Sequence, residues 1–334
     1  MRIPRSNELD LLRLVLATSV VFQHSRLAIT NTHMLWIERI PAVPLFILLS
    51  GLLVTESYLN SPTLRIYIQK RLRRILPAYI VVVLLGGLIL WAIGAFLSLP
   101  GSGSFLQLAS YYFNNLLFLN FLQPCVFDSS IFREVKYCAV NGSLWTIKFE
   151  LFFYMILPFI IFSLGKLPKL ICFFASLLLL VFAMFTPSIY FQIFVCFVAG
   201  VLFSLSRDFW LPSLVNIKIP SILRAFLVLF AAILIGGNFP LPVAAIVLLS
   251  LSFVGTKYAS KDINFLKFGD LSYGIYLVHY PLIQIFVFLR IQLFIHDIFF
   301  APLIIAFSGV LAMLLYRHVE KRFLVAGSHY NSQS

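Results

Sequence analysis

Two ionisable residues in the first apolar stretch have types and spacing that suit chemistry inside a membrane. Arg13 and His24 stand 11 positions apart in the segment LDLLRLVLATSVVFQH. Eleven steps of about 100° make about three helical turns, so both side chains fall on one stripe, about 16 Å apart along the axis. A charge inside a bilayer costs roughly 3 kcal/mol by insertion scales, which makes such residues candidates for function. His24 is therefore a candidate general base, and Arg13 a fixed cation at the other end of its helix.

Each of these residues also has a structural interpretation. A lone histidine in a span is more often satisfied by a backbone carbonyl or by contact with lipid headgroups. The guanidinium of Arg13 can reach the membrane boundary while its methylenes stay in the apolar region. Asp10 stands three positions before Arg13 and can hold that guanidinium through an i,i+3 contact without any catalytic role.

A second acid–base candidate lies in the stretch NGSLWTIKFELFFYMILP. Glu150 stands about seven residues in from the outer end of the predicted span 144–163, at a depth of about 10 Å. His24 stands at a similar depth in its own stretch, and a carboxylate beside an imidazole orients the ring and strengthens it as a base. The alternative is that Glu150 pairs with a donor on another helix for structural reasons. Lys148 faces elsewhere, and we interpret it as a side chain that extends to the interface.

The segment RIYIQKRLRRILPAY (65–79) carries five cations in its first ten residues. We interpret it as a cytoplasmic loop. Charge alone favours a topology anchor on anionic lipid. The sharper hypothesis is a clamp for phosphate groups, because arginine binds phosphate in a bidentate manner.

Two further segments contain residues of interest. The segment FGDLSYGIYLVHYPLI (268–283) places Asp270 and His279 in or beside an apolar stretch, where core packing or a single hydrogen bond is the plain interpretation of the histidine. In LFILLSGLLV, the small residues Ser50 and Gly51 predict a close approach of two helices.

The composition identifies the class of protein that positions these groups. Of the 334 residues, 61% are hydrophobic and 11% are charged, and the mean hydropathy is +0.99. Soluble domains contain about a quarter charged residues, so the sequence indicates a polytopic membrane protein of all-α class. The 25 basic residues against 12 acidic ones point to loops held in the cytoplasm, not to nucleic-acid binding. The four cysteines form no CxxC pair, so we expect no metal site.

About ten apolar stretches are candidates for transmembrane helices. They are residues 9–29, 41–58, 77–98, 144–163, 170–186, 189–206, 222–237, 240–255, 270–289 and 299–316. Residues 105–122 are apolar but carry four Asn and Gln side chains, so they are expected to be interfacial or re-entrant. If they do not cross, 18 basic residues lie inside against 5 outside, with both termini cytoplasmic. Cys125 and Cys138 then share an outer loop, where a disulfide or two thiols are both open alternatives.

Five segments, in order, resemble the acyltransferase 3 membrane family. The first is the Asp10, Arg13 and His24 segment, and LFILLSGLLV resembles the family's FFxLSGFL. KRLRRILPAY is similar to its basic RRxxRIxPxY segment, SLWTIKFELFFY to SLWSLxxExxFY and LSYGIYLVHYP to LSYxxYLxHxP. The matched side chains in the last three are Arg71, Arg73, Arg74, Pro77, Tyr79, Ser143, Trp145, Glu150, Phe153, Tyr154, His279 and Pro281.

The resemblance implies a single acyltransferase domain over residues 1–334. It is nearest to O-acetyltransferases that decorate bacterial O-antigen, including those carried by Shigella-converting phages. It implies acetyl-CoA as the donor and a lipid-linked polysaccharide or O-antigen repeat as the acceptor, in the bacterial inner membrane. His24 and Glu150 are then expected to be catalytic, and Arg13, Arg71, Arg73 and Arg74 to bind CoA. Asp10, Ser143, Trp145, Tyr154 and His279 are expected to support them.

Two departures from the family pattern limit these expectations. Leu151 stands where many relatives carry a second acid, so a pair of adjacent carboxylates is not available. About twenty residues follow the last predicted span, so no appended SGNH-type domain is expected. Two alternatives stay open: a glycolipid transporter or flippase, although no inverted repeat is visible, and transfer of another acyl group or to another acceptor.

Overall fold

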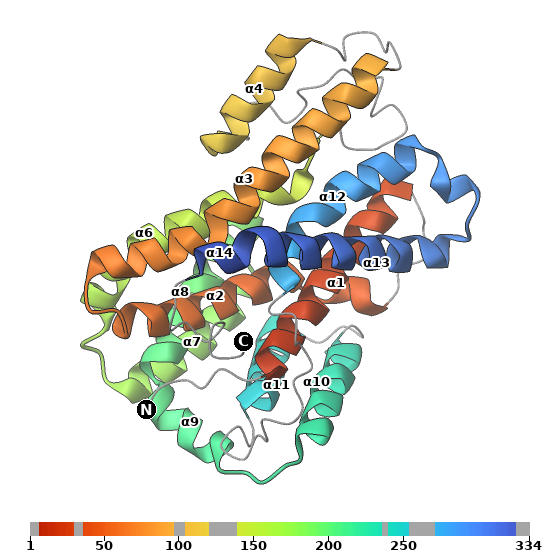
Figure 1. Cartoon of the computed structure of the whole chain (residues 1–334). Coiled ribbons are helices and arrows are strands. Elements are labelled where there is room, and N and C mark those ends of the chain that lie inside the picture. Colours follow the sequence, from red (N-terminus) through yellow and green to blue (C-terminus); the bar gives the residue numbers. More distant parts are fainter. Residues whose placement is uncertain are drawn as a thin grey trace. The chain divides into compact units, whose positions relative to one another are not determined.

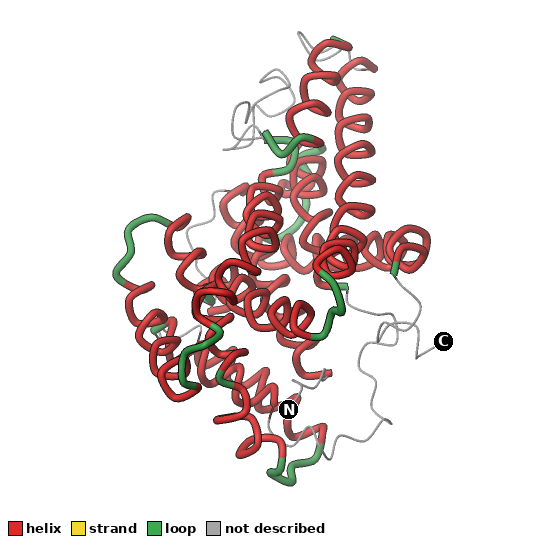
Figure 2. Tube along the Cα trace, turned by 90° about the vertical axis from the view of Figure 1, so that its left-hand side faces the viewer, coloured by secondary structure: helices red, strands yellow, loops and turns green. Residues whose placement is uncertain are grey.

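The computed structural model describes residues 7–29, 36–96, 104–119, 139–235, 240–253 and 271–324. Throughout these ranges the regular elements are helices, in agreement with the all-α prediction (Figure 2). The chain divides into two compact units, and each is described by itself. Unit 1 comprises residues 1–19, 35–69 and 150–270, and unit 2 comprises residues 20–34, 70–149 and 271–334.

Each of the ten predicted spans overlaps a described helix (Figure 1). These helices are α1 (Asn7–Ile29), α2 (Ala42–Leu59), α3 (Leu64–Phe96), α6 (Trp145–Leu164), α7 (Lys169–Met184), α8 (Ile189–Leu205), α10 (Ser221–Ile235), α11 (Leu241–Phe253), α12 (Ser272–Phe288) and α13 (Asp297–Leu315). Shorter elements are η1 (Trp36–Arg39), α4 (Phe105–Leu116), η2 (Gly142–Leu144), α9 (Arg207–Val215), η4 (Ile291–Leu293), η5 (Tyr316–Glu320) and α14 (Lys321–Phe323). Predicted Cys125, Cys138 and Asp270 lie outside the described residues.

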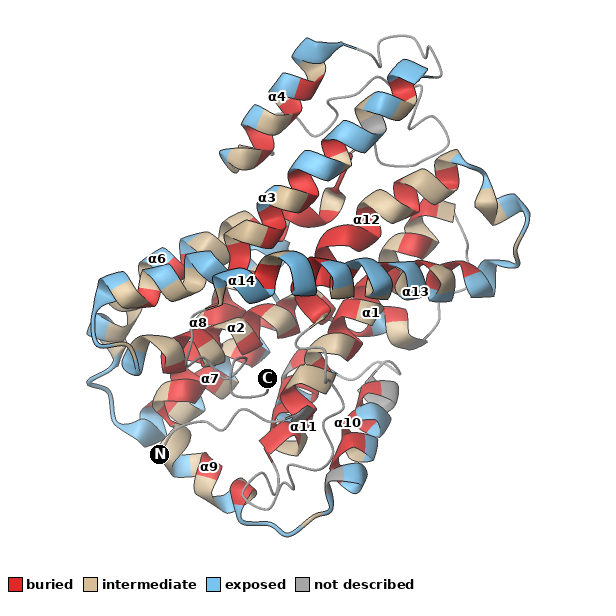
Figure 3. Ribbon diagram, in the orientation of Figure 1, coloured by how far each residue is buried: buried red, intermediate tan, exposed pale blue. Residues whose placement is uncertain are grey.

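Four helical segments in the described ranges are long and apolar enough to cross a membrane on their own. They are Ala42–Leu59, Leu64–Phe96, Gly142–Leu164 and Asp297–Phe323. A fifth candidate arises if α8 and α9, which meet at a bend of 72°, form one broken span. Exposed positions recur along α3, α6 and α13 and include many large apolar side chains, as expected for helices in lipid (Figure 3). The number of ten crossings and the side on which the termini lie stay predictions.

The segment 65–79 is helical, so its interpretation as a loop is wrong. It forms the first half of α3, which continues through Pro77 to Phe96. Residues 65–76 are rich in leucine, lysine, arginine and glutamine, all of which favour a helix. Proline removes only the hydrogen bond to the carbonyl four positions earlier, and the apolar residues after it sustain the helix.

In unit 1, the closest helix pair is α2 with α8. A Cβ atom on Gly51 would overlap the backbone oxygen of Phe197, and one on Gly200 would overlap that of Leu48. Both glycines are therefore needed for the two backbones to approach this closely, which confirms the prediction for Gly51. Cys172 and Cys196 are buried free thiols.

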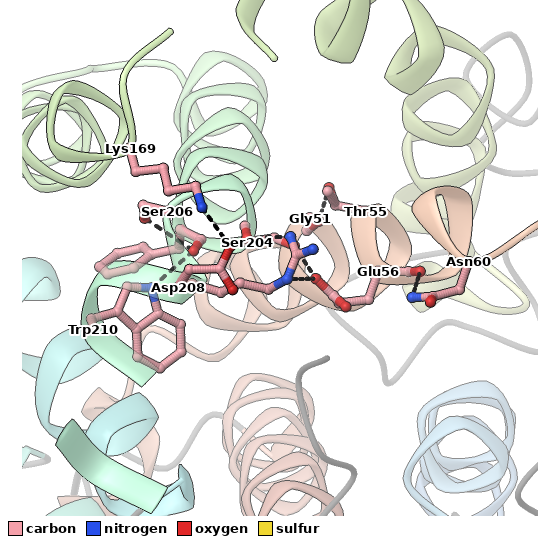
Figure 4. A network of polar contacts seen from close by, with 11 residues as sticks. Gly51, Thr55, Glu56, Asn60, Lys169, Ser204, Ser206, Asp208 and Trp210 are labelled. Carbon is pink, nitrogen blue, oxygen red and sulfur yellow. Dashed lines mark hydrogen bonds and ion pairs between the residues drawn. The ribbon is translucent and has the colours of Figure 1, made fainter. Parts of the chain in front are cut away.

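A polar network joins the end of α2 to the junction of α8 and α9 in unit 1 (Figure 4). Glu56 Oε1 accepts a hydrogen bond from Ser204 at 2.9 Å and lies 3.2 Å from Nε of Arg207. Trp210 donates its indole N–H to the backbone oxygen of Phe203 at 2.9 Å, across the bend. These contacts fix the direction in which α9 leaves α8 and neutralise a carboxylate on an otherwise apolar helix.

A second ion pair in unit 1 is more deeply buried. Arg224 Nη2 on α10 lies 3.0 Å from Glu8 Oε1 on α1, and their side chains are 1% and 2% exposed. A buried charge is tolerated only when it is paired, so the carboxylate of Glu8 needs the guanidinium of Arg224.

In unit 2, α4 packs along the second half of α3 (Figure 1). Tyr79 donates its hydroxyl to the backbone oxygen of Asn115 at 2.7 Å, and Tyr112 donates to that of Leu84 at 2.8 Å. A helix of 12 residues rises about 18 Å, which is short of the ~30 Å of a hydrocarbon core. α4 alone is therefore too short to cross, and the interfacial or re-entrant placement of residues 105–122 stays a prediction.

Also in unit 2, α12 packs tightly on α13. A Cβ atom on Gly274 would come within 2.7 Å of Cβ of Ala312, so the absence of a side chain sets this approach. α12 continues through Pro281 to Phe288. This buried helix carries His279 and forms the frame of the candidate site.

Candidate active site

His24 and His279 form a hydrogen-bonded pair in unit 2. Nδ1 of His24 on α1 lies 2.8 Å from Nε2 of His279 on α12. The two rings are nearly parallel, at 6°, with centroids 5.1 Å apart. His279 is fully buried, and its Nδ1 lies 3.1 Å from the backbone oxygen of Ile275. The histidine that the sequence singled out as a base is therefore held by a second histidine.

Pro281 leaves one backbone carbonyl of α12 without its helical hydrogen bond, and Asn141 supplies the missing donor. Proline has no N–H, so the carbonyl of Leu277, four residues earlier, lacks its helical donor. Asn141 Nδ2 donates to this oxygen at 2.8 Å. Asn141 also accepts hydrogen bonds from the backbone N–H and the hydroxyl of Ser143, at 3.1 and 2.6 Å. The segment that precedes α6 thus replaces a missing helical hydrogen bond two residues away from His279.

Ser143 and Thr146 extend this contact toward the helical turn that carries His279. The backbone oxygen of Tyr276 lies 3.1 Å from Ser143 Oγ and shares the hydroxyl hydrogen with Asn141 Oδ1. The hydroxyl of Tyr276 donates to the backbone oxygen of Ser143 at 3.0 Å and shares a 2.7 Å hydrogen bond with Oγ1 of Thr146. All three side chains are buried, so these bonds fix α12 against the start of α6. The predicted supporting residues Ser143 and His279 therefore belong to one assembly.

A cavity of about 310 Å³ adjoins the histidine pair. Tyr280 forms one of its walls, with its ring edge-on to His24 at 5.2 Å. The ring also packs so closely on Gly142 that a Cβ there would meet it at 2.6 Å. Gln284 donates from Nε2 to the backbone oxygen of Ala139 at 2.7 Å. The lining consists of His24, Leu27, Ala28, Ala139, Gly142, Tyr280, Ile283 and Gln284. This mostly apolar pocket with a few polar groups has the character of a small-molecule site.

Glu150 lies in unit 1, where it contacts two hydroxyl groups. Its Oε1 accepts hydrogen bonds from Tyr154 one turn later on α6 and from Ser50 on α2, the latter at 3.4 Å. The backbone oxygen of Tyr154 accepts from the hydroxyl of Tyr67 at 3.0 Å. Glu150 and its predicted supporting residue Tyr154 are thus in contact. The catalytic role of Glu150 stays a prediction.

Arg71, Arg73 and Arg74, the arginines on α3 that were predicted to bind CoA, have different surroundings within unit 2. Arg74 Nη1 lies 3.3 Å from Oε2 of Glu320, which is 3% exposed, and its guanidinium lies 5.8 Å from the centroid of the Tyr273 ring. Arg71 is half-buried, and Arg73 is exposed. Arg73 is therefore the member of this cluster that is most open to a ligand.

The remaining predicted residues occupy two helices. Asp10 and Arg13 are half-buried in the first half of α1 in unit 1. Trp145 is half-buried at the start of α6, edge-on to Phe149 at 5.9 Å. Lys148 Nζ lies 5.6 Å from the centroid of the same Phe149 ring. The CoA-binding role of Arg13 and the supporting roles of Asp10 and Trp145 stay predictions.

Several site residues were not anticipated from the sequence. They are Asn141, Thr146, Tyr276, Tyr280, Gln284 and Glu320, together with Ser50 as a contact of Glu150. The sequence contained a signal for a donor such as Asn141, because Pro281 inside an apolar stretch leaves the carbonyl four residues earlier without its helical N–H. The polar side chain of Gln284 in a span was a second such signal.

The chain is similar in sequence to known proteins. The sequence profile of the acyltransferase 3 family, described as an acyltransferase domain, matches residues 6–317. The chain is also similar to nodulation protein 10 of Rhizobium leguminosarum bv. viciae, with 31% identity over 168 residues. That alignment covers 46% of this chain and 44% of the relative, so it spans less than half of either protein. No solved structure matches the chain significantly.

Proposed function

The chain belongs to the acyltransferase 3 family and is a membrane acyltransferase, and from this premise we propose that it is an O-acetyltransferase of the bacterial inner membrane. The proposed donor is cytoplasmic acetyl-CoA. The proposed acceptor is a sugar hydroxyl of an O-antigen, lipopolysaccharide or related surface polysaccharide on the periplasmic side. The observation that supports this most is the pairing of His24 with His279 beside a cavity of about 310 Å³.

The proposed reaction uses His24 as the general base. Its imidazole takes the proton of the sugar hydroxyl while the hydroxyl oxygen attacks the carbonyl carbon of the thioester. A C–O bond forms and the C–S bond breaks, and the departing CoA thiolate takes the proton from the imidazolium. No co-reactant is required. A route through an acetyl-histidine is the main alternative, and acetylated His24 trapped with acetyl-CoA alone would support it.

The proposal also assigns roles to three arginines and to Glu150. Arg73 and Arg71 bind the phosphates of CoA, with Arg13 as a further cation, because guanidinium groups bind phosphate through bidentate hydrogen bonds. Glu150 is proposed as a second catalytic residue. Asp10, Trp145 and Tyr154 are proposed to support these groups.

Mass spectrometry of the O-polysaccharide from expressing cells tests this function. Cells carrying the wild-type protein are compared with cells carrying His24→Ala, at matched membrane levels of the two proteins. His296→Ala is the matched control, since His296 is exposed at the start of α13. We expect a gain of one acetyl group per repeat that is lost only in His24→Ala. An unchanged gain in His24→Ala would refute the assignment of the base, and no gain in several polysaccharide backgrounds would refute the acceptor.

A further inference from the structure

We propose that His279 is a positioning residue that holds His24 in the tautomer in which Nδ1 carries the hydrogen and Nε2 is the basic atom. The proposal rests on the acyl transfer proposed above, with His24 as its base. It assigns to a neutral imidazole the orienting role that a carboxylate fills in Ser–His–Asp triads.

The hydrogens in the two contacts that join Ile275, His279 and His24 can be assigned by starting from the backbone oxygen of Ile275. A backbone carbonyl only accepts hydrogen bonds, so Nδ1 of His279, which faces the oxygen of Ile275, must carry a hydrogen. A neutral His279 then has its lone pair on Nε2. That atom lies 2.8 Å from Nδ1 of His24, so His24 must donate there. In a neutral His24 the remaining lone pair is on Nε2.

The assigned lone pair is at the position that the chemistry needs. Nδ1 of His24 is turned to His279, and the ring itself lines the cavity, so Nε2 is the nitrogen left to meet a substrate. The Tyr280 ring packs edge-on against His24 and the His279 ring lies parallel to it, which limits rotation of the imidazole. A base that is fixed in one tautomer and one orientation loses no further conformational entropy when it reaches the reactive geometry, which lowers the barrier.

The surroundings of His279 explain why it can hold this position. It is fully buried on α12, and Asn141 and Ser143 bond the backbone oxygens of Leu277 and Tyr276 just before it. Hydrogen-bonded neighbours of this kind lock the rotamer of a group that supports a functional side chain. The segment around Ser143 therefore acts on His24 through His279.

Three substitutions at position 279 separate positioning from packing. His279→Gln places an amide oxygen where Nε2 stood, so a hydrogen-bond acceptor for His24 is kept. His279→Asn is too short to reach, and His279→Leu has no acceptor. Purified full-length variants are compared in initial-rate assays with acetyl-CoA and a polysaccharide precursor, and their melting midpoints in detergent are recorded. His296→Leu is the control for the loss of a histidine elsewhere.

We expect kcat to fall about 100-fold to 10,000-fold in His279→Leu and His279→Asn, the range for a misplaced general base. The KM for acetyl-CoA should stay within about twofold, and His279→Gln should keep kcat within about tenfold of the wild type. If folded His279→Gln is as slow as His279→Leu, or if His279→Leu keeps the wild-type kcat, the proposal is wrong.

A spectroscopic measurement keeps this test independent of the proposed activity. Nitrogen-15 spectra of histidine-labelled protein distinguish a ring protonated at Nδ1 from one protonated at Nε2. We expect the Nδ1–H form for His24 in the wild type and loss of that preference in His279→Leu. An Nε2–H form in the wild type overturns the inference. Absence of acetyl transfer by a wild-type protein that shows the Nδ1–H form refutes only the proposed function.

Discussion

The guanidinium of Arg74 and the carboxylate of Glu320 join the first half of α3 to the helical segment that follows α13, with Nη1 and Oε2 3.3 Å apart. The two side chains are 13% and 3% exposed, so this is a largely buried pair. Arg73, the preceding residue, is exposed. Two adjacent arginines of one basic motif therefore have different surroundings, and we expect different consequences of replacing them.

Arg73→Ala should raise the KM for acetyl-CoA by about tenfold or more and leave the melting midpoint unchanged. A hydrogen bond to a charged group contributes roughly 1.5–3 kcal/mol, and 1.4 kcal/mol is a factor of ten. Arg74→Ala should instead lower the melting midpoint, because it removes the guanidinium that pairs with the buried carboxylate of Glu320. Glu320→Gln weakens the same pair and serves as the matched control. An unchanged KM in Arg73→Ala would favour the topology-anchor interpretation of the cluster.

Glu150→Gln should lower kcat less than His24→Ala does. The amide keeps the size of the side chain and still accepts hydrogen bonds from Tyr154 and Ser50, but it has no charge. Tyr154→Phe is the control, since it removes one of these donors and leaves the carboxylate. We expect a loss of roughly tenfold to 100-fold in Glu150→Gln in initial-rate assays. A complete loss of turnover in a folded Glu150→Gln protein would assign it a role equal to that of His24.

Arg224→Met should destabilise the protein by about 3–5 kcal/mol, because Glu8 would be left as a buried, unpaired charge. The double variant Glu8→Leu with Arg224→Met should recover most of that loss, since two apolar side chains need no partner. Lys169→Ala tests an exposed pair instead, Lys169 with Asp208 at 2.7 Å, and should cost no more than about 1 kcal/mol. Melting midpoints in detergent measure all of these effects. A double variant no more stable than Arg224→Met would contradict the argument.

The sequence alone predicts the helices far better than the partners of polar side chains. Apolar stretches locate ten helices because burial in lipid or core requires a long apolar run. The close approach at Gly51 is also predictable from the small side chain itself. The start of α3 was predicted too late, because the predicted span covers residues 77–98 and the helix begins at Leu64. The first half of α3 is too basic to be recognised as an apolar stretch, although its residues favour a helix.

The contact of His24 with His279 was not predictable in this way. The two residues are 255 positions apart, and periodicity and composition carry no information on which helices become neighbours. Similar depth suggested Glu150 as the partner, but depth restricts only one of three coordinates. The described hydrogen-bond partner of the His24 ring is another histidine. The sequence predicts which residues are candidates for the chemistry, and the fold assigns their contacts.

Asn141 and Pro281 should be coupled in a double-mutant cycle. Asn141→Ala removes the donor to the Leu277 carbonyl, which Pro281 leaves without a helical N–H, and a buried acceptor without a donor costs about 1–3 kcal/mol. Pro281→Ala restores a backbone N–H at position 281, which can donate to the same oxygen. In the Pro281→Ala background, Asn141→Ala should therefore cost clearly less than it does alone.

The cycle is measured as melting midpoints of the four proteins in one detergent, with turnover recorded for each. Gln284→Leu is a useful comparison, because the described hydrogen bond of Gln284 goes to the backbone oxygen of Ala139 in the same segment and not to the Leu277 carbonyl. Its cost should be equal in both backgrounds. Equal costs of Asn141→Ala in both backgrounds would mean that Asn141 supports α12 by its contact with Ser143 and not by replacing the missing helical hydrogen bond.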